Sequence, residues 1–327
     1  MNDLDCCRNA TVFGSFWNTW FTKVPYKLTM SPSSRISRRH LALLAILVVI
    51  WGSSFALSKI AIHDVDPNWV AALRLTIGGS IIFAIAQWYN QSPLRVRKSW
   101  PKYVWLGVIG NALPFILISW GIQYTSSGVT GLLMGTIPLF VIVIAHFLLP
   151  DEKLNVQKAC GFVLGFIGVV ILMNPQQLLG ASFQRQELWG DLAIILACLC
   201  YGIHSVTAKR LGFDKPFQQT SGILLAGAVA AVLFAITKNP HGLEALTFNS
   251  SLAILGLGLF PTAISMVIVY YLMEHIGPSA VSFTNYLVPI FALLLGAVAF
   301  NETLSWNIAL ALLCILAGIA ITSFSRR

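Results

Sequence analysis

Runs of about twenty consecutive apolar residues dominate this sequence and restrict what it can fold into. A run of this length is what an α-helix needs to cross the hydrocarbon core of a bilayer. Only 10% of the 327 residues are charged, whereas a soluble domain carries about 25%. So few charges exclude a surface that faces water, and most of the chain must be solvated by lipid. Ten runs qualify as spans: 41–62, 69–89, 101–122, 126–149, 156–173, 189–209, 217–237, 250–274, 278–299 and 304–323.

The basic residues lie between these runs, and their distribution predicts the orientation. With the N-terminus in the cytoplasm, seventeen Lys and Arg fall on inner segments, and only Arg185 and Lys238 fall on outer ones. Cytoplasmic segments of membrane proteins carry such an excess. The pattern predicts a multi-pass protein of the inner (plasma) membrane with both termini in the cytoplasm. It excludes nucleic acid as a partner, because the net charge of +9 is not gathered on one face.

A shift of 150 residues lays the second half of the chain on the first. Lys59 then falls on Lys209 and Glu152 on Glu302. Each unit holds five spans, an odd number, so the second must be inverted relative to the first. The sequence predicts an all-α polytopic membrane protein with ten transmembrane helices arranged as two inverted five-helix repeats. The expected parts are a cytoplasmic tail (1–40), a first repeat (41–173), an outer linker (174–188) and a second repeat (189–323).

Four blocks of sequence carry a resemblance to a known family. They are WGSSFALSK in the first span, GDLAIILACLCYG from Gly190, and the blocks DEKLNVQKACGFVLGFIGVVIL and NETLSWNIALALLCILAGIAI that end the two halves. Together they resemble the EamA-type branch of the drug/metabolite transporter superfamily over about residues 41–323. The resemblance implies a secondary transporter that works by alternating access. The favoured function is a facilitator or exchanger that exports a small organic metabolite, such as an amino acid or a related compound.

Few ionisable groups fall inside the predicted spans. Arg74 is expected to hold a substrate carboxylate or a structural partner such as Asp191, with snorkelling to the outer interface as its alternative. Lys59 is expected to snorkel. A satisfied core histidine is the favoured interpretation of His204. No Asp or Glu falls near the middle of a span, which disfavours a carboxylate proton relay, unless His204 carries the proton.

Prolines and polar residues mark the spans that can line a cavity. Proline kinks a membrane helix, and matched prolines in both repeats predict gating kinks. The polar and aromatic candidates on these spans have helix packing as their alternative role. The predicted kinks are at Pro114, Pro138, Pro261 and Pro289. The candidate substrate-binding residues are Arg74, Trp51, Asn111, Trp120, Tyr201, His204, Tyr270 and Asn285.

Carboxylates and glycines have structural interpretations. Glu152 and Glu302 begin the last span of each repeat, where a carboxylate is favoured by the helix dipole, so both are expected to cap those helices. Two GxxxG pairs, at Gly131 and Gly161, are expected to permit close packing within the chain. The protein is therefore expected to be a monomer or a weak homodimer, with the lipid bilayer and a small-molecule substrate as its partners.

Two further alternatives concern the tail and the class of protein. Aromatic residues at helical spacing in 1–29 indicate either an interfacial amphipathic helix or an extension of the gene model upstream of Met30. The rival functions are an intramembrane enzyme and a membrane sensor. The chain has no HExxH or GxSxG motif and its six histidines are scattered, so we expect no catalytic residue, no metal and no cofactor.

Overall fold

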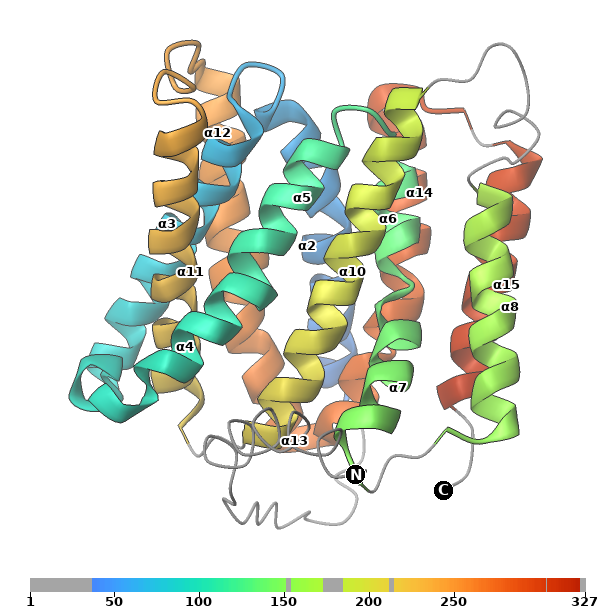
Figure 1. Ribbon diagram of the computed structural model, residues 1–327, viewed down its shortest axis with the longest axis horizontal. Helices are drawn as coiled ribbons and strands as arrows, with labels where there is room; N and C mark the ends of the chain where they lie inside the picture. Colours follow the sequence, from blue (N-terminus) through green and yellow to red (C-terminus); the bar gives the residue numbers. More distant parts are fainter. Residues whose placement is uncertain (1–36, 151–153, 173–184, 212–214, 304, 324–327) are drawn as a thin grey trace, which may run out of the picture.

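The structure is a computed structural model, and it describes residues 37–150, 154–172, 185–211, 215–303 and 305–323. Within these ranges the chain forms helices and turns and no β-strand. Figure 1 shows the helices standing side by side in one bundle. The helices of the first half are α2 (Arg38–Ala61), α3 (Pro67–Trp88), η1 (Pro93–Arg95), η2 (Arg97–Ser99), α4 (Trp100–Gly107), η3 (Val108–Ala112), α5 (Leu113–Gly121), α6 (Ser127–Met134), α7 (Ile137–Leu148) and α8 (Val156–Leu172). Those of the second half are α10 (Arg185–Leu211), α11 (Pro216–Lys238), α12 (Phe248–Leu257), η4 (Gly258–Ile264), α13 (Ser265–Ser282), α14 (Thr284–Phe300) and α15 (Trp306–Ser323).

Polar side chains at the helix starts explain where several helices begin. The side chains of Ser37, Asp66, Ser126 and Thr247 accept hydrogen bonds from backbone N–H groups in the first turns of α2, α3, α6 and α12. Such caps satisfy donors that have no partner inside the helix. The loops 62–66, 122–126 and 239–247 lie at the upper end of the bundle in Figure 1. Glu302 hydrogen-bonds to the start of α6, directly after the loop 122–126, so we call this the Glu302 end.

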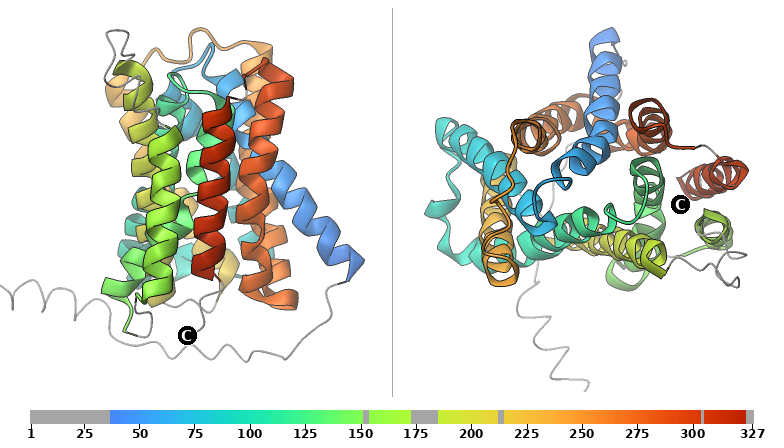
Figure 2. Two further views of the ribbon diagram at one scale, coloured as in Figure 1. Left: turned by 90° about the vertical axis from the view of Figure 1, so that its right-hand side faces the viewer. Right: turned by 90° about the horizontal axis from the view of Figure 1, so that it is seen from above.

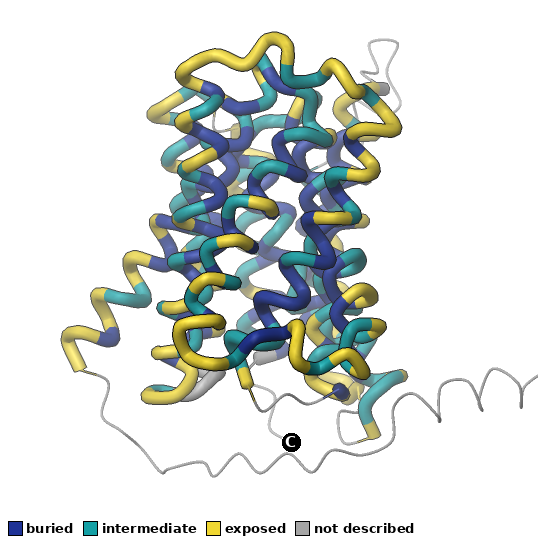
Figure 3. Tube along the Cα trace, turned by 90° about the vertical axis from the view of Figure 1, so that its left-hand side faces the viewer, coloured by how far each residue is buried: buried dark blue, intermediate teal, exposed yellow. Residues whose placement is uncertain are grey.

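The ten predicted spans correspond to observed helices. Among the described residues, seven helical stretches are long and apolar enough to cross a bilayer, and three shorter apolar helices, Val156–Leu172, Thr284–Phe300 and Trp306–Thr322, match the remaining predicted spans. Figure 3 shows buried positions turned towards the inside of the bundle and exposed positions on its outside and at its ends. Large apolar side chains such as Leu233 and Leu313 are exposed on this outside, as lipid-facing residues are expected to be.

One predicted boundary is wrong. The join expected near Gly277 lies inside α13, and the chain turns instead at Phe283. The helix continues past Gly277 because Val281 is buried in a cluster with Leu47 and Leu272.

The packing of the helices follows the two repeats. α3 packs along α11 and α8 packs along α15, so each of these helices contacts its own counterpart in the other repeat. α10 packs on α5 and α7, which belong to the third and fourth spans, while α2 packs on α12 and α14, which belong to the eighth and ninth, so corresponding spans meet with the repeats exchanged. The prediction of two inverted five-helix repeats is thereby confirmed.

Glycines bring pairs of helices into close contact. α8 and α15 form one edge of the bundle and lie side by side in both panels of Figure 2. A Cβ on Gly161 would lie 2.6 Å from the carbonyl oxygen of Gly318, so this crossing requires glycine. On α6, a Cβ on Gly135 would lie 2.8 Å from Cγ of Pro289 on α14. Both GxxxG pairs therefore serve packing within the chain.

Two matched π-helical segments interrupt the spans that hold Pro114 and Pro261. They are η3, which starts at Val108, and η4, which starts at Gly258, 150 residues later. Proline removes one backbone donor, and a π-helical turn is a common way for a helix to absorb such a defect. Pro138 follows the break between α6 and α7, whereas Pro289 lies inside the continuous helix α14.

Candidate substrate cavity

A cavity of about 490 Å³ lies between the two repeats. Helices of both repeats form its walls, among them α2, α3, α5, α10, α13 and α14. It extends from Ser58 on α2 towards the end of the bundle opposite the Glu302 end, where Met273 and Ser282 line it. Small-molecule sites typically enclose about 300–1,000 Å³, so this space fits a small metabolite.

Arg74 on α3 lines the cavity with only 8% of its surface exposed. Its Nε donates a hydrogen bond to Oγ1 of Thr262 at 3.0 Å, and its guanidinium carbon lies 4.0 Å from the centre of the Phe115 ring. Among the described residues no carboxylate forms an ion pair with it, and its two terminal nitrogens have no hydrogen-bond partner. The guanidinium is held at one edge while its terminal donors remain free for a ligand.

Thr262 links Arg74 to the proline defect in η4. Pro261 has no N–H to offer the carbonyl of Leu257, four residues earlier, and the Thr262 hydroxyl donates to that oxygen at 2.8 Å. The same oxygen atom of Thr262 accepts from Arg74. The kink in one repeat therefore fixes the position of the arginine in the other. Thr262 is not among the residues predicted from the sequence, although a hydroxyl directly after a proline inside a span is the pattern that could have revealed it.

His204 on α10 also lines the cavity. Its Nδ1 lies 3.2 Å from the carbonyl oxygen of Leu106, which can only accept, so Nδ1 carries the proton in this contact. The ring packs against Gly110, where a Cβ would collide with it. The histidine has the satisfied hydrogen bond that the sequence interpretation favoured, and it is in the cavity wall as well.

The other predicted residues divide into two groups. Trp51, Asn111, Tyr201 and Asn285 line the cavity, as do Pro261 and Pro289. Trp120, Tyr270, Pro114 and Pro138 do not.

The two aromatic residues outside the cavity are held elsewhere. Trp120 is exposed at the end of α5 and its ring contacts that of Tyr124. The hydroxyl of Tyr270 contacts Thr220, and its ring packs on Phe217, so this side chain joins α13 to α11.

Two expectations about charged residues are wrong, and one of the alternatives for Arg74 is excluded. Lys59 does not snorkel: its Nζ lies 2.9 Å from Oε1 of Glu302, because a carboxylate is within reach inside the bundle. Glu302 does not cap α15: its carboxylate accepts from the backbone N–H groups of Ser127 and Gly128 at the start of α6. Arg74 is not paired with Asp191, whose Oδ1 is buried near the start of α10 and has no hydrogen-bond partner in the part of the chain that the structure describes. Glu152, the counterpart of Glu302, lies outside the described residues.

Arg74 is the only Asp, Glu, Lys or Arg among the described residues that line the cavity. Around it are the rings of Trp51, Phe55, Phe115 and Tyr201 and several apolar side chains. The described residues hold no group of three or more His, Cys, Asp or Glu placed to bind a metal. The wall therefore offers one fixed positive charge in a mainly apolar and aromatic setting, which suits a small anion with an apolar body.

Comparison with known proteins agrees with this architecture. The model of the EamA-like transporter family matches the chain twice, over residues 39–174 and 188–324. The chain belongs to this family. The transporter YoaV of Bacillus subtilis, described as uncharacterized, is 29% identical over 281 residues, which span 85% of this chain and 94% of YoaV.

Relatives of lower sequence identity also align with most of this chain. An uncharacterized transporter of Archaeoglobus fulgidus is 25% identical over 80% of this chain and 90% of its own. A chloroplastic WAT1-related protein of Arabidopsis thaliana is 24% identical over 78% of this chain and 62% of its own. A solved crystal structure that is 23% identical superposes with a TM-score of 0.62 over 86% of this chain and 96% of that one, and supports the fold alone. The protein is a multi-pass membrane transporter of the EamA-like family.

Proposed function

We propose that the protein is a facilitator or exchanger for a small organic metabolite that carries one carboxylate, such as an amino acid or a related compound, and that its physiological direction is export. The single observation that carries this proposal is Arg74, which lines the cavity with its terminal nitrogens unpaired among the described residues. A buried cation is costly without a partner, and a planar guanidinium binds a carboxylate through two parallel hydrogen bonds.

The surroundings of Arg74 narrow the substrate class. No acidic side chain is among the described residues of the cavity wall, so a substrate with a net positive charge would meet repulsion and no compensation. The aromatic rings offer an apolar surface for the body of the molecule. A substrate ammonium group is compatible with this wall only through the faces of rings such as Trp51.

The test begins with metabolite profiling of a deletion strain against an overexpressing strain. The compound that changes is then offered to proteoliposomes as the carboxylic acid, which is ionised at neutral pH, and as the amide, in which an uncharged group replaces the carboxylate. The acid should be transported at least tenfold faster than the amide at equal concentration. Equal transport of both forms would show that the cavity does not select the carboxylate.

We also propose that both termini face the cytoplasm in an inner membrane, which puts the Glu302 end outside. The support is the excess of basic residues on the opposite segments. Reporter fusions at residues 97, 155 and 213 should report inside, and fusions at 65 and 242 should report outside. A reversed signal from a well-expressed fusion would overturn this orientation.

Alternating access is the mechanism that fits two inverted repeats around one cavity. The two repeats exchange conformations, and the central cavity opens first to one side and then to the other. We propose that this happens within one chain, as a monomer or a weak homodimer, since both GxxxG pairs are used inside the molecule.

A further inference from the structure

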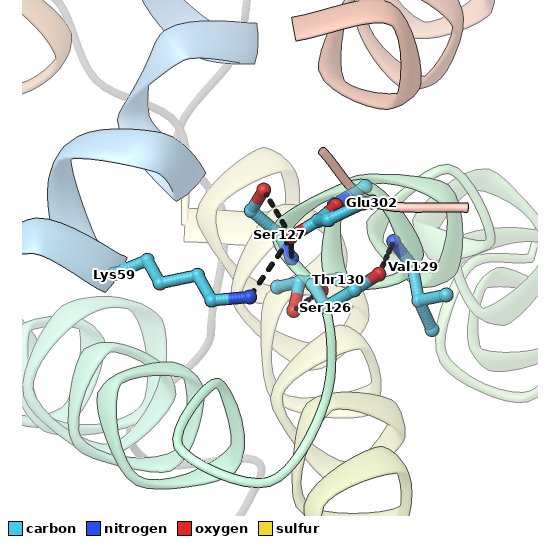
Figure 4. Close-up of polar contacts among 7 residues, drawn as sticks. Lys59, Ser126, Ser127, Val129, Thr130 and Glu302 are labelled. Carbon is cyan, nitrogen blue, oxygen red and sulfur yellow. Dashed lines mark hydrogen bonds and ion pairs between the residues drawn. The ribbon is translucent and has the colours of Figure 1, made fainter. Parts of the chain in front are cut away.

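Glu302 accepts four hydrogen bonds at the Glu302 end of the bundle, opposite the end towards which the cavity extends. Its Oε1 accepts from Nζ of Lys59 at 2.9 Å and from the backbone N and the Oγ of Ser127 at 2.8 and 2.9 Å. Its Oε2 accepts from the backbone N of Gly128 at 2.9 Å. Figure 4 shows the carboxylate between the lysine and the start of α6. We call Lys59, Ser127, Gly128 and Glu302 the Glu302 cluster.

The local backbone is built to place this carboxylate. Asn301 ends α14 in the left-handed conformation with φ 53°, and its N–H bonds to the carbonyl of Gly296. A side chain at Gly296 would collide with Oε2 of Glu302. Ser126 caps the N–H of Val129, so the N–H groups of Ser127 and Gly128 are left for Glu302.

The cluster joins three parts of the chain that belong to different repeats. Lys59 lies in the last turn of α2 and Ser127 begins α6, both in the first repeat, whereas Glu302 follows α14 of the second repeat. The three elements cannot separate at this end unless the carboxylate leaves its donors. Only 12% of the Glu302 side chain is exposed, so little water is at hand to replace them.

The cluster lies directly beyond one end of the cavity. Ser58 lines the cavity and is adjacent to Lys59, while no described residue of the loops 62–66, 122–126 and 301–303 lines it. In the other direction the cavity reaches Ser282, next to the turn between α13 and α14. The cavity is thus closed at the Glu302 end and extends towards the opposite end.

We propose that the Glu302 cluster is the outer gate of the transporter: its hydrogen bonds hold the cavity closed to the outside, and they must break before the cavity opens there. The gate acts on the conformational equilibrium, so weakening it shifts the population towards the outward-open state. This inference is independent of the substrate and of the role of Arg74. It is therefore tested without transport.

The experiment measures access to the cavity from each side. Ser54, which lines the cavity, is replaced by cysteine, and a membrane-impermeant thiol reagent is applied to right-side-out and inside-out vesicles. The chain without Ser54→Cys gives the background from its own cysteines. With the gate intact, labelling should be fast from the side opposite the Glu302 end and slow from the Glu302 side.

Glu302→Gln should raise the labelling rate from the Glu302 side at least tenfold, because it removes the charge while keeping the size of the side chain. Lys59→Met should raise it by a smaller factor, since the donors from α6 remain. Glu244→Gln is the matched control, because Glu244 is exposed at the same end and contacts only His241 in the described structure.

Two results would overturn the proposal that the Glu302 cluster is a gate. One is an unchanged labelling rate from the Glu302 side in a folded Glu302→Gln protein. The other is fast labelling from that side before any gate residue is changed. If Glu302→Gln does not accumulate in the membrane, Lys59→Met decides alone: a rate equal to that of the Glu244→Gln control refutes the proposal.

Discussion

Arg74 and Lys59 are both cations of the same helical bundle, but they differ in burial and in whether a carboxylate neutralises them. Lys59 is at the end of α2, its side chain is 32% exposed, and Glu302 neutralises it at 2.9 Å. Arg74 is 8% exposed, and in the described structure it has a hydroxyl and an aromatic face as neighbours and no carboxylate. The less hydrated cation is the one without a counter-ion.

This difference distinguishes a charge that stabilises the structure from a charge that can bind a substrate. A buried ion pair whose remaining donors are satisfied is complete and needs no ligand. A buried cation that lacks a counter-ion gains most from an anion that enters its cavity, because the desolvation cost has already been met in folding. The paired lysine therefore suits the gate, and the unpaired arginine suits the substrate site.

The largest expected effect comes from removing the unpaired charge. Losing one partner of a buried charged pair costs about 2–5 kcal/mol, so Arg74→Ala should lower uptake of the substrate at least about 30-fold in proteoliposomes. Arg74→Lys should recover only part of this, because the planar fork is lost. Arg97→Ala, at an exposed position in η2, is the control for loss of an arginine. Full activity of a well-inserted Arg74→Ala would remove Arg74 from the site.

A smaller effect should follow from removing the hydrogen bond that holds Arg74 in place. Thr262→Val removes the hydroxyl that accepts from Nε, and a hydrogen bond to a charged group contributes about 1.5–3 kcal/mol. Because the stacking on Phe115 still holds the guanidinium, we expect only part of this free energy to be lost, so that KM rises by up to about tenfold with little change in the maximal rate. Thr262→Ser keeps the hydroxyl and should transport normally. A loss of maximal rate at constant KM would instead mean that Thr262 only supports the kink at Pro261.

The sequence predicts most of this fold, because the features that identify a transmembrane helix lie within the helix itself and its flanking residues. Apolar length and flanking charge locate helices such as α3 and α11, and the offset of 150 residues recurs in the structure as the matched segments η3 and η4. The join placed near Gly277 fails because packing of Val281 overrides the local signal.

The site is less predictable because it depends on pairs across the repeats. Arg74 stands out as a charge in an apolar run, but its neighbour Thr262 is 188 residues away. The partner of Lys59 is 243 residues away, so the position of each residue within its own span could not show it. Asp191 and Trp120 have suitable chemistry, yet helix rotation and packing turn them away from the cavity.

A further variant tests whether Arg74 acts through an ion pair with Asp191, which is an alternative predicted from the sequence. Among the described residues Asp191 forms no ion pair with Arg74 and its Oδ1 has no hydrogen-bond partner, so Asp191→Asn removes a buried carboxylate without breaking an ion pair there. We expect transport to stay within about twofold of the parent protein, well below the effect of Arg74→Ala. A loss of transport as large as that of Arg74→Ala would support a structural ion pair between Asp191 and Arg74 and would argue against a substrate role for the arginine.

The smallest expected effect is that of mild acid on the gate. Burial raises the pKa of the Glu302 carboxyl, but the hydrogen bonds from Lys59, Gly128 and Ser127 outweigh it, and the pKa lies below its ordinary value of 4.5. A lowered pKa means that the stabilisation by the carboxylate is fully present above the ordinary value and is lost only as the pH falls through the lowered one. Labelling of Ser54→Cys from the Glu302 side should therefore stay constant between about pH 8 and 5.5, after correction for the reactivity of the thiol itself. An increase within this window that Glu302→Gln abolishes would mean that the carboxylate already takes up a proton there. The Glu302 cluster would then respond to pH, and the contrast between a complete ion pair and an incomplete cation would no longer hold.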